Sequence, residues 1–173
     1  MTRRRPLRLL LAALLALGTV LSVQSPAHAS FTWFLMEQLT LTSDMCLQPA
    51  DNSTLAGAAI VQEPCSLTNS AQNWQTLPLG GGVYRVQNQW SGMCLDARGG
   101  ATNGTPVQQW PCNSISNERW TITVLYDWVP LISRVSGTSS HCMDTPGGAS
   151  SVPGLAMQLY TCNRTAAQKW WTQ

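Results

Sequence analysis

Six cysteines divide this chain of 173 residues into three copies of one module, and that regularity constrains the fold more than any other feature. The first cysteines of the three copies are 48 residues apart, and a second cysteine follows each of them after 18 to 20 residues. A tryptophan follows each second cysteine after eight or nine residues, in the segments Gln72-Asn73-Trp74, Glu118-Arg119-Trp120 and Gln168-Lys169-Trp170. A fixed period of this length indicates one structural unit repeated three times.

The repeat favours one cysteine pairing without deciding it. Six cysteines permit fifteen pairings, among which a sequence does not choose. Zinc is the other common use of clustered cysteines, but the spacings contain no Cys-x-x-Cys pair, and His141 is the only histidine after residue 29. We therefore expect no metal or other cofactor. The economical pairing is one disulfide within each module: Cys46 with Cys65, Cys94 with Cys112 and Cys142 with Cys162.

The N-terminal segment has the three parts of a secretory signal peptide. Four arginines stand among the first eight residues, an apolar run extends from Leu9 to Val23, and the triplet Ala27-His28-Ala29 precedes Ser30. The fifteen residues of the apolar run would span about 22 Å as a helix, less than the roughly 30 Å hydrocarbon core of a bilayer, which disfavours a membrane anchor. We expect cleavage after Ala29 and a secreted protein, residues 30–173, without a membrane span.

The charge distribution argues against nucleic acid as a partner. The full chain carries a formal charge of +2, but after removal of residues 1–29 six Lys and Arg remain with eight Asp and Glu, which gives −2. The remaining cations are scattered, without the basic stripe that follows a phosphate backbone or an anionic membrane. Charged residues make up only 10% of the chain, against about 25% in an average soluble domain, so we expect a surface rich in amides and hydroxyls.

Short β-strands separated by turns are expected throughout the three copies. Segments such as Val83–Val86 and Thr121–Val124 alternate in polarity or are β-branched, and clusters of Gly, Pro, Asn and Ser separate them. No useful stretch of helical period follows Ser30, so the predicted fold class is all-β. A period near 48 residues also occurs in solenoids and propellers, but three copies without a distinct capping repeat favour closure about a threefold axis.

The motifs carry a resemblance to a known family. The Cys-Leu-Asp opening, the Gln-x-aromatic-x-Cys segment, the closing Gln-x-Trp and the three copies resemble the ricin-type β-trefoil lectins, which include the family 13 carbohydrate-binding modules of secreted bacterial proteins. The resemblance implies a β-trefoil of twelve strands in three units, α, β and γ, with up to one shallow sugar pocket each. These first, second and third repeats are expected at about residues 34–78, 79–126 and 127–173.

The resemblance also implies which side chains bind a sugar. Carboxylates accept hydrogen bonds from vicinal hydroxyls, amides accept and donate them, and an aromatic face covers the apolar C–H side of a sugar ring. In the second repeat the family's Asp, Gln, aromatic and Asn positions hold Asp96, Gln108, Trp110 and Asn117. This repeat departs from the family at Glu118, where the family usually has Gln, mainly as a scaffold residue. The Glu either adds an acceptor for a sugar hydroxyl or serves the scaffold alone. We expect the best pocket in this repeat.

The third repeat retains a reduced set of these residues. It keeps Asp144, Gln158 and Tyr160, but Ala167 stands where the family has Asn. One amide contact is therefore lost, and we expect weaker or altered binding rather than none. The alternative for Asp96 and Asp144 is that they cap turns, because a Gly-Gly pair follows each of them closely.

The first repeat lacks the sugar-binding set. Gln48 replaces the Asp, Ala71 replaces the Asn, and Glu63 or Pro64 replaces the aromatic, depending on where a one-residue deletion is placed. We expect this repeat to be structural.

The tryptophans of the closing motifs have a structural interpretation. Trp74, Trp120 and Trp170 are expected in the core as parts of the Gln-x-Trp scaffold. Trp110 is expected in the pocket, with an ordinary strand position under a loop as the alternative. Exposure of several tryptophans outside the motifs, such as Trp90 and Trp171, would indicate a second contact surface.

The sequence gives little support for a catalytic activity. The sequence after residue 29 offers no Ser/His/Asp arrangement, no Gly-rich phosphate loop, and no free cysteine if the pairs form. Asp96 and Glu118 are two carboxylates, as in a glycosidase pair, but such pairs flank a scissile bond at about 5 to 9.5 Å in a deep cleft, whereas the family's pockets are shallow. We expect no enzymatic activity.

These observations predict a secreted, non-catalytic lectin module. The family's usual ligands are galactosides and xylan-type glycans, which we expect the second repeat to bind and the third repeat to bind more weakly or with altered preference. The alternative is a trefoil retained for protein contact, such as a protease inhibitor or an accessory to a separately encoded enzyme or toxin. The missing pocket of the first repeat and the altered pocket of the third favour that alternative.

Overall fold

A computed structural model describes residues 34–38, 44–113, 115–122, 131–133 and 140–172 of the chain. All of them belong to the unit formed by residues 31–173. The expected signal peptide and its cleavage position lie outside the described residues, so both stay predictions. Within the described part of the chain, no helix is long and apolar enough to cross a membrane.

The regular elements of the described residues are thirteen β-strands and four 3-10 turns, with no α-helix among them, which confirms the all-β class. The 3-10 turns are η1 (Ala50–Asn52), η2 (Ser70–Gln72), η3 (Ser116–Glu118) and η4 (Ala166–Gln168). The strands are β1 (Phe34–Gln38), β2 (Met45–Pro49), β3 (Ile60–Pro64), β4 (Asn73–Gly80), β5 (Val83–Asn88), β6 (Cys94–Ala97), β7 (Val107–Trp110), β8 (Trp120–Ile122), β9 (Leu131–Ser133), β10 (His141–Asp144), β11 (Leu155–Ala156), β12 (Gln158–Thr161) and β13 (Trp170–Thr172).

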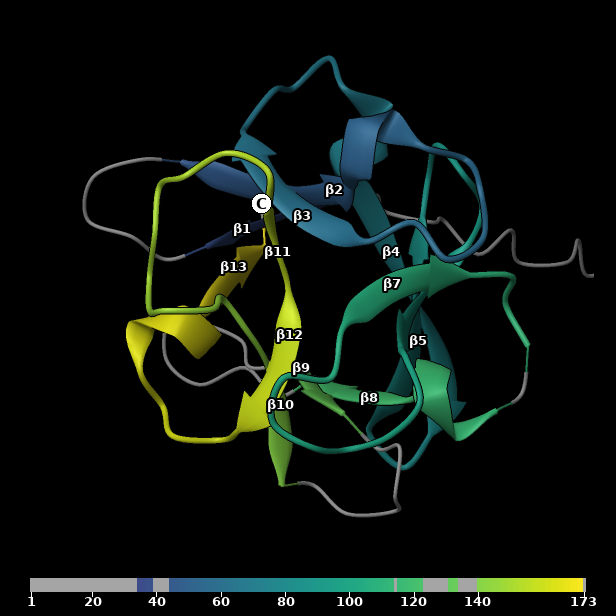
Figure 1. The fold of residues 1–173 in the computed structure, drawn as a ribbon. Helices are drawn as coiled ribbons and strands as arrows, with labels where there is room; N and C mark the ends of the chain where they lie inside the picture. The colour runs from purple at the N-terminus through teal and green to yellow at the C-terminus, as the bar shows by residue number, and fades with distance from the viewer. Residues whose placement is uncertain (1–33, 39–43, 114, 123–130, 134–139, 173) are drawn as a thin grey trace, which may run out of the picture. The chain divides into compact units, whose positions relative to one another are not determined.

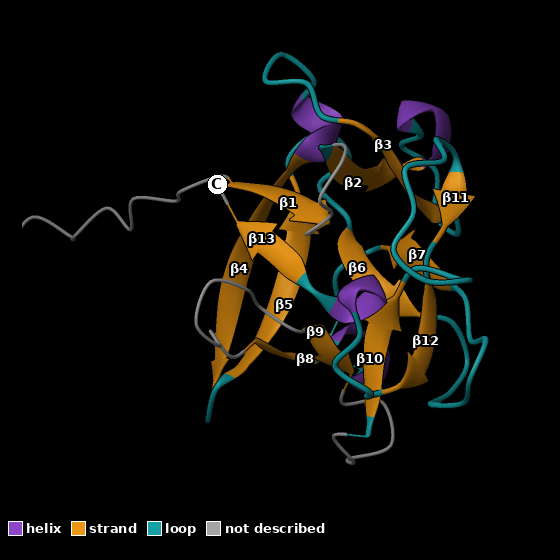
Figure 2. Cartoon of the chain, turned by 90° about the vertical axis from the view of Figure 1, so that its left-hand side faces the viewer, coloured by secondary structure: helices purple, strands orange, loops and turns teal. Residues whose placement is uncertain are grey.

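Four strands make up each repeat, in agreement with the expected twelve, and β11 is an additional two-residue strand that pairs with β3. The middle two strands of each repeat form antiparallel hairpins, β2–β3, β6–β7 and β10–β12. The outer strands join in the order β13–β1–β4–β5–β8–β9. Figure 1 shows the three hairpins around a common centre, and in Figure 2 the outer strands β4 and β5 lie to the left of β6–β7.

The disulfides follow the pairing that the repeat favours. Each joins the first strand of a hairpin to a cysteine that follows the second strand, directly in the first and third repeats and after one residue in the second. The Cα–Cα distances of 4.9 to 5.0 Å agree with ordinary disulfide geometry. The three bonds are Cys46–Cys65, Cys94–Cys112 and Cys142–Cys162, and they leave no cysteine free.

The three Gln-x-Trp tryptophans form the centre of the hydrophobic core, which confirms their predicted structural role. Their side chains are fully buried, and each indole nitrogen donates to a backbone carbonyl of its own hairpin, so these three buried N–H groups are paired. The acceptor in each repeat is the residue that directly follows the first cysteine. The pairs are Trp74 with Leu47 at 2.9 Å, Trp120 with Leu95 at 2.9 Å and Trp170 with Met143 at 3.3 Å.

Buried glutamines hold neighbouring repeats together. Gln62 of the first repeat donates from Nε2 to the carbonyl oxygens of Ser150 and Val152 in the third repeat, both over 2.9 Å. Gln109 of the second repeat makes an equivalent pair of bonds to the loop at residues 53–55 of the first, over 2.8 and 2.9 Å. Because these loops follow the first strand of each hairpin, the glutamines fix the surroundings of the candidate pockets.

Candidate functional site

Each hairpin of the second and third repeats places the expected acid opposite the expected amide. Asp96 of β6 pairs in register with Gln108 of β7, and Asp144 of β10 pairs with Gln158 of β12. Directly opposite side chains in antiparallel strands are close enough to interact. Gln108 Nε2 donates to Asp96 Oδ1 over 2.8 Å, and Gln158 Nε2 donates to Asp144 Oδ1 over 2.9 Å. Both carboxyl groups are buried and held in a defined orientation.

The aromatic residues of the two candidate pockets lie at equivalent positions with accessible rings. Trp110 is opposite Cys94, and Tyr160 is opposite Cys142. Each side chain is 40% exposed, although it belongs to a strand of the hairpin. Trp110 is therefore not a buried strand aromatic, and both rings are available to stack on a ligand.

The register of the first repeat decides which residue takes the aromatic position. Glu63 lies opposite Cys46, so it corresponds to Trp110, and no residue is deleted within the hairpin. Val61 lies opposite Gln48 and corresponds to Gln108. The first repeat therefore lacks the acid, the amide and the aromatic ring.

Amide side chains fill the corresponding place in the first repeat. Gln48 Oε1 accepts from Asn69 Nδ2 over 3.1 Å and from Gln72 Nε2 over 2.9 Å. Gln48 Nε2 donates to Asn52 Oδ1 over 2.9 Å. These bonds satisfy the polar groups from within the repeat, which agrees with the structural role expected for it.

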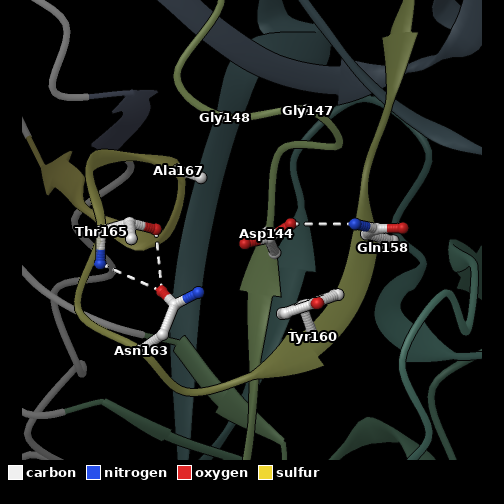
Figure 3. Close-up of a pocket in the computed structure, with 8 residues that line it drawn as sticks. All are labelled: Asp144, Gly147, Gly148, Gln158, Tyr160, Asn163, Thr165 and Ala167. Carbon is white, nitrogen blue, oxygen red and sulfur yellow. Dashed lines mark hydrogen bonds between the residues drawn. The ribbon is translucent and has the colours of Figure 1, made fainter.

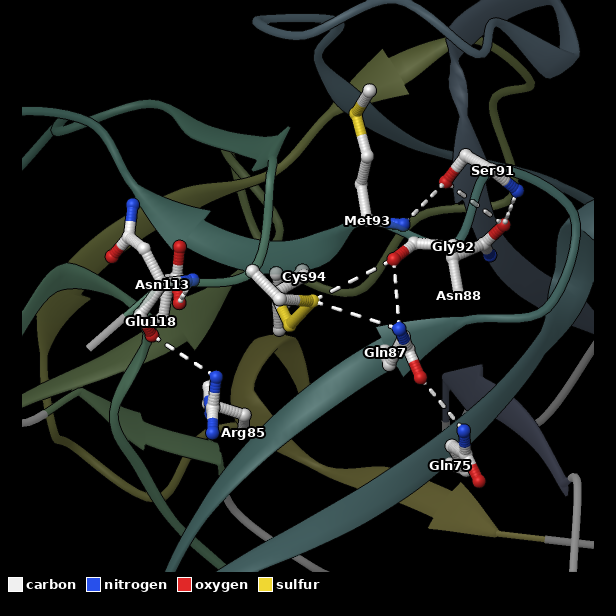
Figure 4. The surroundings of a disulfide bond; sticks show 12 residues. Gln75, Arg85, Gln87, Asn88, Ser91, Gly92, Met93, Cys94, Asn113 and Glu118 are labelled. Carbon is white, nitrogen blue, oxygen red and sulfur yellow. Dashed lines mark hydrogen bonds between the residues drawn. A yellow bond between two sulfur atoms is a disulfide. The ribbon is translucent and has the colours of Figure 1, made fainter. Parts of the chain in front are cut away.

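The closing position of each repeat, the first residue of its Gln-x-Trp motif, lies in a 3-10 turn. The three residues are Gln72, Glu118 and Gln168. Asn117, the fourth member of the predicted set, is half-buried in η3, next to Glu118. Glu118 itself is fully buried, and its Oε2 accepts from the backbone N–H of Asn113 over 2.8 Å. Figure 4 shows Glu118 and Asn113 beside Arg85 and the disulfide of Cys94.

The two carboxyl groups of the second repeat have perturbed acidity. Burial raises the pKa of Asp96, and the hydrogen bond from Gln108 opposes this effect. Burial also raises the pKa of Glu118; the Asn113 hydrogen bond lowers it, the nearby charge of Asp96 raises it, and Arg85 lowers it. Both groups therefore favour the protonated state more than free carboxyls do.

A cavity of about 350 Å³ opens in the third repeat, which the sequence ranks second as a site. Figure 3 shows the predicted residues Asp144, Gln158 and Tyr160 on one side of it. Ala167 lines the cavity at the place of the family's Asn. The complete lining is Asp144, Gly147, Gly148, Gln158, Tyr160, Asn163, Thr165 and Ala167.

Asn163 and Thr165 are lining residues that the sequence reasoning missed. Asn163 Oδ1 accepts from the backbone N–H of Thr165 over 3.0 Å and from its Oγ1 over 2.8 Å. In Figure 3 the amide nitrogen of Asn163 points toward the side of the pocket that holds Asp144 and Tyr160. The signal was present in the sequence, because an Asn directly follows the second cysteine in the second and third repeats but not in the first.

No cluster of three or more potential metal ligands occurs among the described residues. The carboxyl pair considered for glycoside hydrolysis, Asp96 of β6 and Glu118 of η3, is buried. What the described geometry offers is a set of oriented hydrogen-bonding groups beside an exposed ring, in two repeats related by the internal symmetry.

Comparison with solved structures identifies the fold. A designed threefold-symmetric protein, ThreeFoil, is 25% identical and superposes with a TM-score of 0.73 over 81% of this chain and 96% of its own. An exo-β-1,3-galactanase from Clostridium thermocellum is 23% identical, with a TM-score of 0.72 over 82% of this chain and 30% of the enzyme. A ricin B-like lectin of Macrolepiota procera, in complex with lactose, is 17% identical, with a TM-score of 0.66 over 82% and 94% of the two chains. The predicted β-trefoil is thereby confirmed.

Sequence comparison identifies the family. Nigrin b of Sambucus nigra is 55% identical over 31 residues, which are 17% of this chain and 6% of that protein, so the chain spans only a small part of this relative. The profile of the ricin-type β-trefoil lectin domain matches residues 36–170, more than three quarters of the sequence. The chain belongs to the ricin-type β-trefoil lectin domain family.

Proposed function

We propose that the protein is a secreted, non-catalytic lectin whose second and third repeats each bind one sugar of a galactoside or xylan-type glycan. The observation that carries the proposal is the duplicated arrangement of an oriented Asp–Gln pair beside a 40% exposed aromatic ring. Two repeats retain this arrangement, while the first repeat has exchanged every part of it.

Each part of the arrangement has a role in binding a sugar. The hydrogen bond from Gln108 fixes the Asp96 carboxylate, which then accepts from ring hydroxyls without first having to be ordered. Gln108 Oε1 and the Asn117 amide provide further hydrogen-bonding groups. The ring of Trp110 covers the apolar face of the sugar. A single shallow pocket of this kind binds at about millimolar Kd, so retention on a polymer depends on both pockets acting together.

In the third repeat, Asp144, Gln158 and Tyr160 take the same roles. Asn163 supplies from another direction the amide donor that is lost at Ala167. The pocket is therefore altered rather than abolished, and its preference among sugars is expected to differ from that of the second repeat.

The galactoside part of the proposal has support from fold relatives. One is described in complex with lactose, a galactoside, and another is part of a β-1,3-galactanase. Xylan-type glycans remain the second ligand class to test. The expectation of a non-catalytic protein rests on the sequence, which offers no Ser/His/Asp arrangement and no Gly-rich phosphate loop after residue 29.

Secretion is supported by the N-terminal pattern and by the three disulfides, since such bonds persist in oxidising compartments. Expression of the full chain followed by mass spectrometry of the protein in the medium tests it directly. A mature N-terminus at Ser30 is the expected result, and retention of residues 1–29 contradicts it.

The test of sugar binding combines a glycan array with titration calorimetry. We expect array signals for galactosides or xylo-oligosaccharides, and loss of one binding site in Asp96→Ala and in Trp110→Ala. Trp171→Ala is the matched control, because Trp171 is 38% exposed but lies on β13, outside the hairpins. Unchanged binding in both pocket variants would refute the assignment of the second repeat.

Affinity chromatography separates the lectin from the protein-contact alternative. A lectin is retained on agarose or xylan and released by free sugar. A protease inhibitor, or an accessory of a separately encoded enzyme, ignores both matrices and is instead captured with its protein partner.

A further inference from the structure

The closing position of each repeat links two parts of its hairpin, except in the second repeat. In the third repeat, Gln168 Nε2 donates to Thr161 O over 3.0 Å and to Asp144 Oδ2 over 3.1 Å. In the first repeat, Gln72 Nε2 makes the equivalent pair of bonds over 3.0 and 2.9 Å. In the third repeat the amide nitrogen thus supports Asp144, which lines the cavity.

Glu118 takes this position in the second repeat and has no nitrogen with which to donate. Its Oε2 accepts from the N–H of Asn113, as the oxygens of the two glutamines accept from the corresponding N–H groups. Its Oε1 is buried and has no hydrogen-bond partner among the described residues. By the equivalence of the three repeats, Oε1 corresponds to the amide nitrogen of the two glutamines, whose acceptors correspond in the second repeat to the Pro111 carbonyl and the second oxygen of Asp96.

An ionised Glu118 therefore adds a third hydrogen-bond acceptor to the Pro111 carbonyl and the second carboxyl oxygen of Asp96. The charged groups that face it from the neighbouring described elements are Asp96 of β6 and Arg85 of β5. Arg85 attracts the carboxylate, but its Nη1 donates to the carbonyl of Asn113 over 3.1 Å and it makes no hydrogen bond to Oε1. A proton on Oε1 converts the acceptor into the missing donor.

We propose that Glu118 is a pH-dependent positioning residue for Asp96, which makes glycan binding by the second repeat strongest at acidic pH. When protonated, Glu118 gives Asp96 the hydrogen bond that Gln168 gives Asp144. When ionised, it repels the Asp96 carboxylate and leaves Gln108 as the side chain that orients it. The third repeat has an amide at this position and does not share the dependence.

The sugar-binding part of this inference rests on the proposed function, whereas the proton on Glu118 does not. The first experiment therefore needs no ligand. The carboxyl carbons of Glu118 and Asp96 are followed by ¹³C NMR as the pH rises. We expect Glu118 to titrate above its ordinary value of 4.5, with a linked shift at the Asp96 signal. Titration of Glu118 at or below that value overturns the proposal.

The second experiment measures sugar affinity by titration calorimetry at about pH 4.5 and about pH 7.5 in a Tyr160→Ala background, which leaves only the second pocket intact. We expect binding to weaken about tenfold at the higher pH, as is usual when a buried acceptor loses a hydrogen bond. Glu118→Gln should bind alike at both pH values, because its amide restores the donor. If Glu118 had a structural role alone, Glu118→Gln would lower the affinity equally at both pH values.

The reciprocal variant uses the third pocket, isolated by Trp110→Ala. Gln168→Glu places a carboxyl beside Asp144 and should introduce the pH dependence that the parent lacks. If neither pocket binds any sugar while Glu118 titrates as expected, the proposed function fails and the coupling of Glu118 to Asp96 stands. If sugar binds with the same affinity at both pH values in the Tyr160→Ala background, with and without Glu118→Gln, the coupling of Glu118 to Asp96 fails and the lectin function stands.

Discussion

The indole nitrogen of Trp120 donates a hydrogen bond over 2.9 Å to the carbonyl oxygen of Leu95, the residue that directly precedes Asp96. The same bond recurs in the other two repeats. It ties the strand that carries the pocket acid to the core, so the position of the acid depends on a residue that is too deeply buried to touch a ligand.

Trp120→Phe tests the contribution of this bond. The change keeps a buried aromatic ring but leaves the Leu95 carbonyl without its donor and part of the space unfilled. We expect the free energy of unfolding to fall by about 1 to 3 kcal/mol, measured by urea denaturation followed by circular dichroism. Trp171→Phe, at an exposed site, is the control and should change stability little. Equal losses in the two variants would contradict a special role for Trp120.

Removal of a disulfide should cost a similar amount in each repeat. Replacing Cys94 and Cys112 together by Ala opens a loop with a sequence separation of 18 residues, and the Cys46–Cys65 pair spans 19. The chain-entropy estimate for loops of this size is about 3 kcal/mol. Denaturation of the two double variants provides the measurement. A loss confined to one of them would show that local packing outweighs chain entropy.

Gly57→Ala should destabilise the loop that reaches the second repeat. The φ angle of Gly57 is +84°, a conformation that L residues adopt at a cost, while an added Cβ would stand at an ordinary 3.7 Å from the ring of Trp110. We expect a loss of about 1 kcal/mol from the backbone conformation alone. Gly100→Ala is the matched control, because Gly100 has no positive φ and nothing lies within 4 Å of its added Cβ. Thermal unfolding of both variants checks the difference.

Two substitutions of Asn163 separate its structural role from ligand binding in the third pocket. Asn163→Asp retains the oxygen that accepts from Thr165 but removes the amide donor, whereas Asn163→Ala removes both. If the donor contacts the sugar, both variants should bind it about threefold to tenfold more weakly. Calorimetry in a Trp110→Ala background measures the third pocket alone. Retained affinity in Asn163→Asp would limit Asn163 to shaping the loop.

The stability of the protein should fall as pH rises above the acidic range. The pKa values of Asp96 and Glu118 are raised by burial in the folded state, from ordinary values of 3.8 and 4.5. The folded protein therefore binds these protons more tightly than the unfolded chain, and their contribution is complete below the ordinary values and lost as pH rises through the folded ones.

Urea denaturation from about pH 4 upward measures this effect. Asp96→Asn removes one of the titrating groups, so its stability should depend less on pH than that of the wild type. Asp44→Asn, which changes an exposed carboxyl, is the control. A wild-type stability that rises steadily over this range would contradict the expected sign.

The family resemblance predicted most of the candidate site. Asp96 and Gln108 are twelve residues apart, and the hairpin between them follows from strand-forming residues around a turn-rich segment. The resemblance also named Asp144, Gln158 and Tyr160, which the structure places at the cavity of the third repeat. Asn163 was missed although an Asn directly follows the second cysteine in two repeats, because that pattern does not reveal that the side chain lines a cavity. The equivalence of Glu63 with Trp110 also required the observed register, since a shift of one residue reverses the face of a side chain.

The sequence by itself indicated the threefold module and the all-β class, because both depend on periodicity and on local residue patterns. It favoured one disulfide in each module without deciding the pairing, and the family resemblance supplied the aspartates of the two candidate pockets. Only the tertiary structure decided the surroundings of Glu118, whose unpaired oxygen is recognised by comparison with Gln72 and Gln168 in space. Burial and the absence of a donor are properties of the packed neighbours rather than of the residue. The effect of exchanging an amide for a carboxyl therefore becomes visible only when the three repeats have folded around one core.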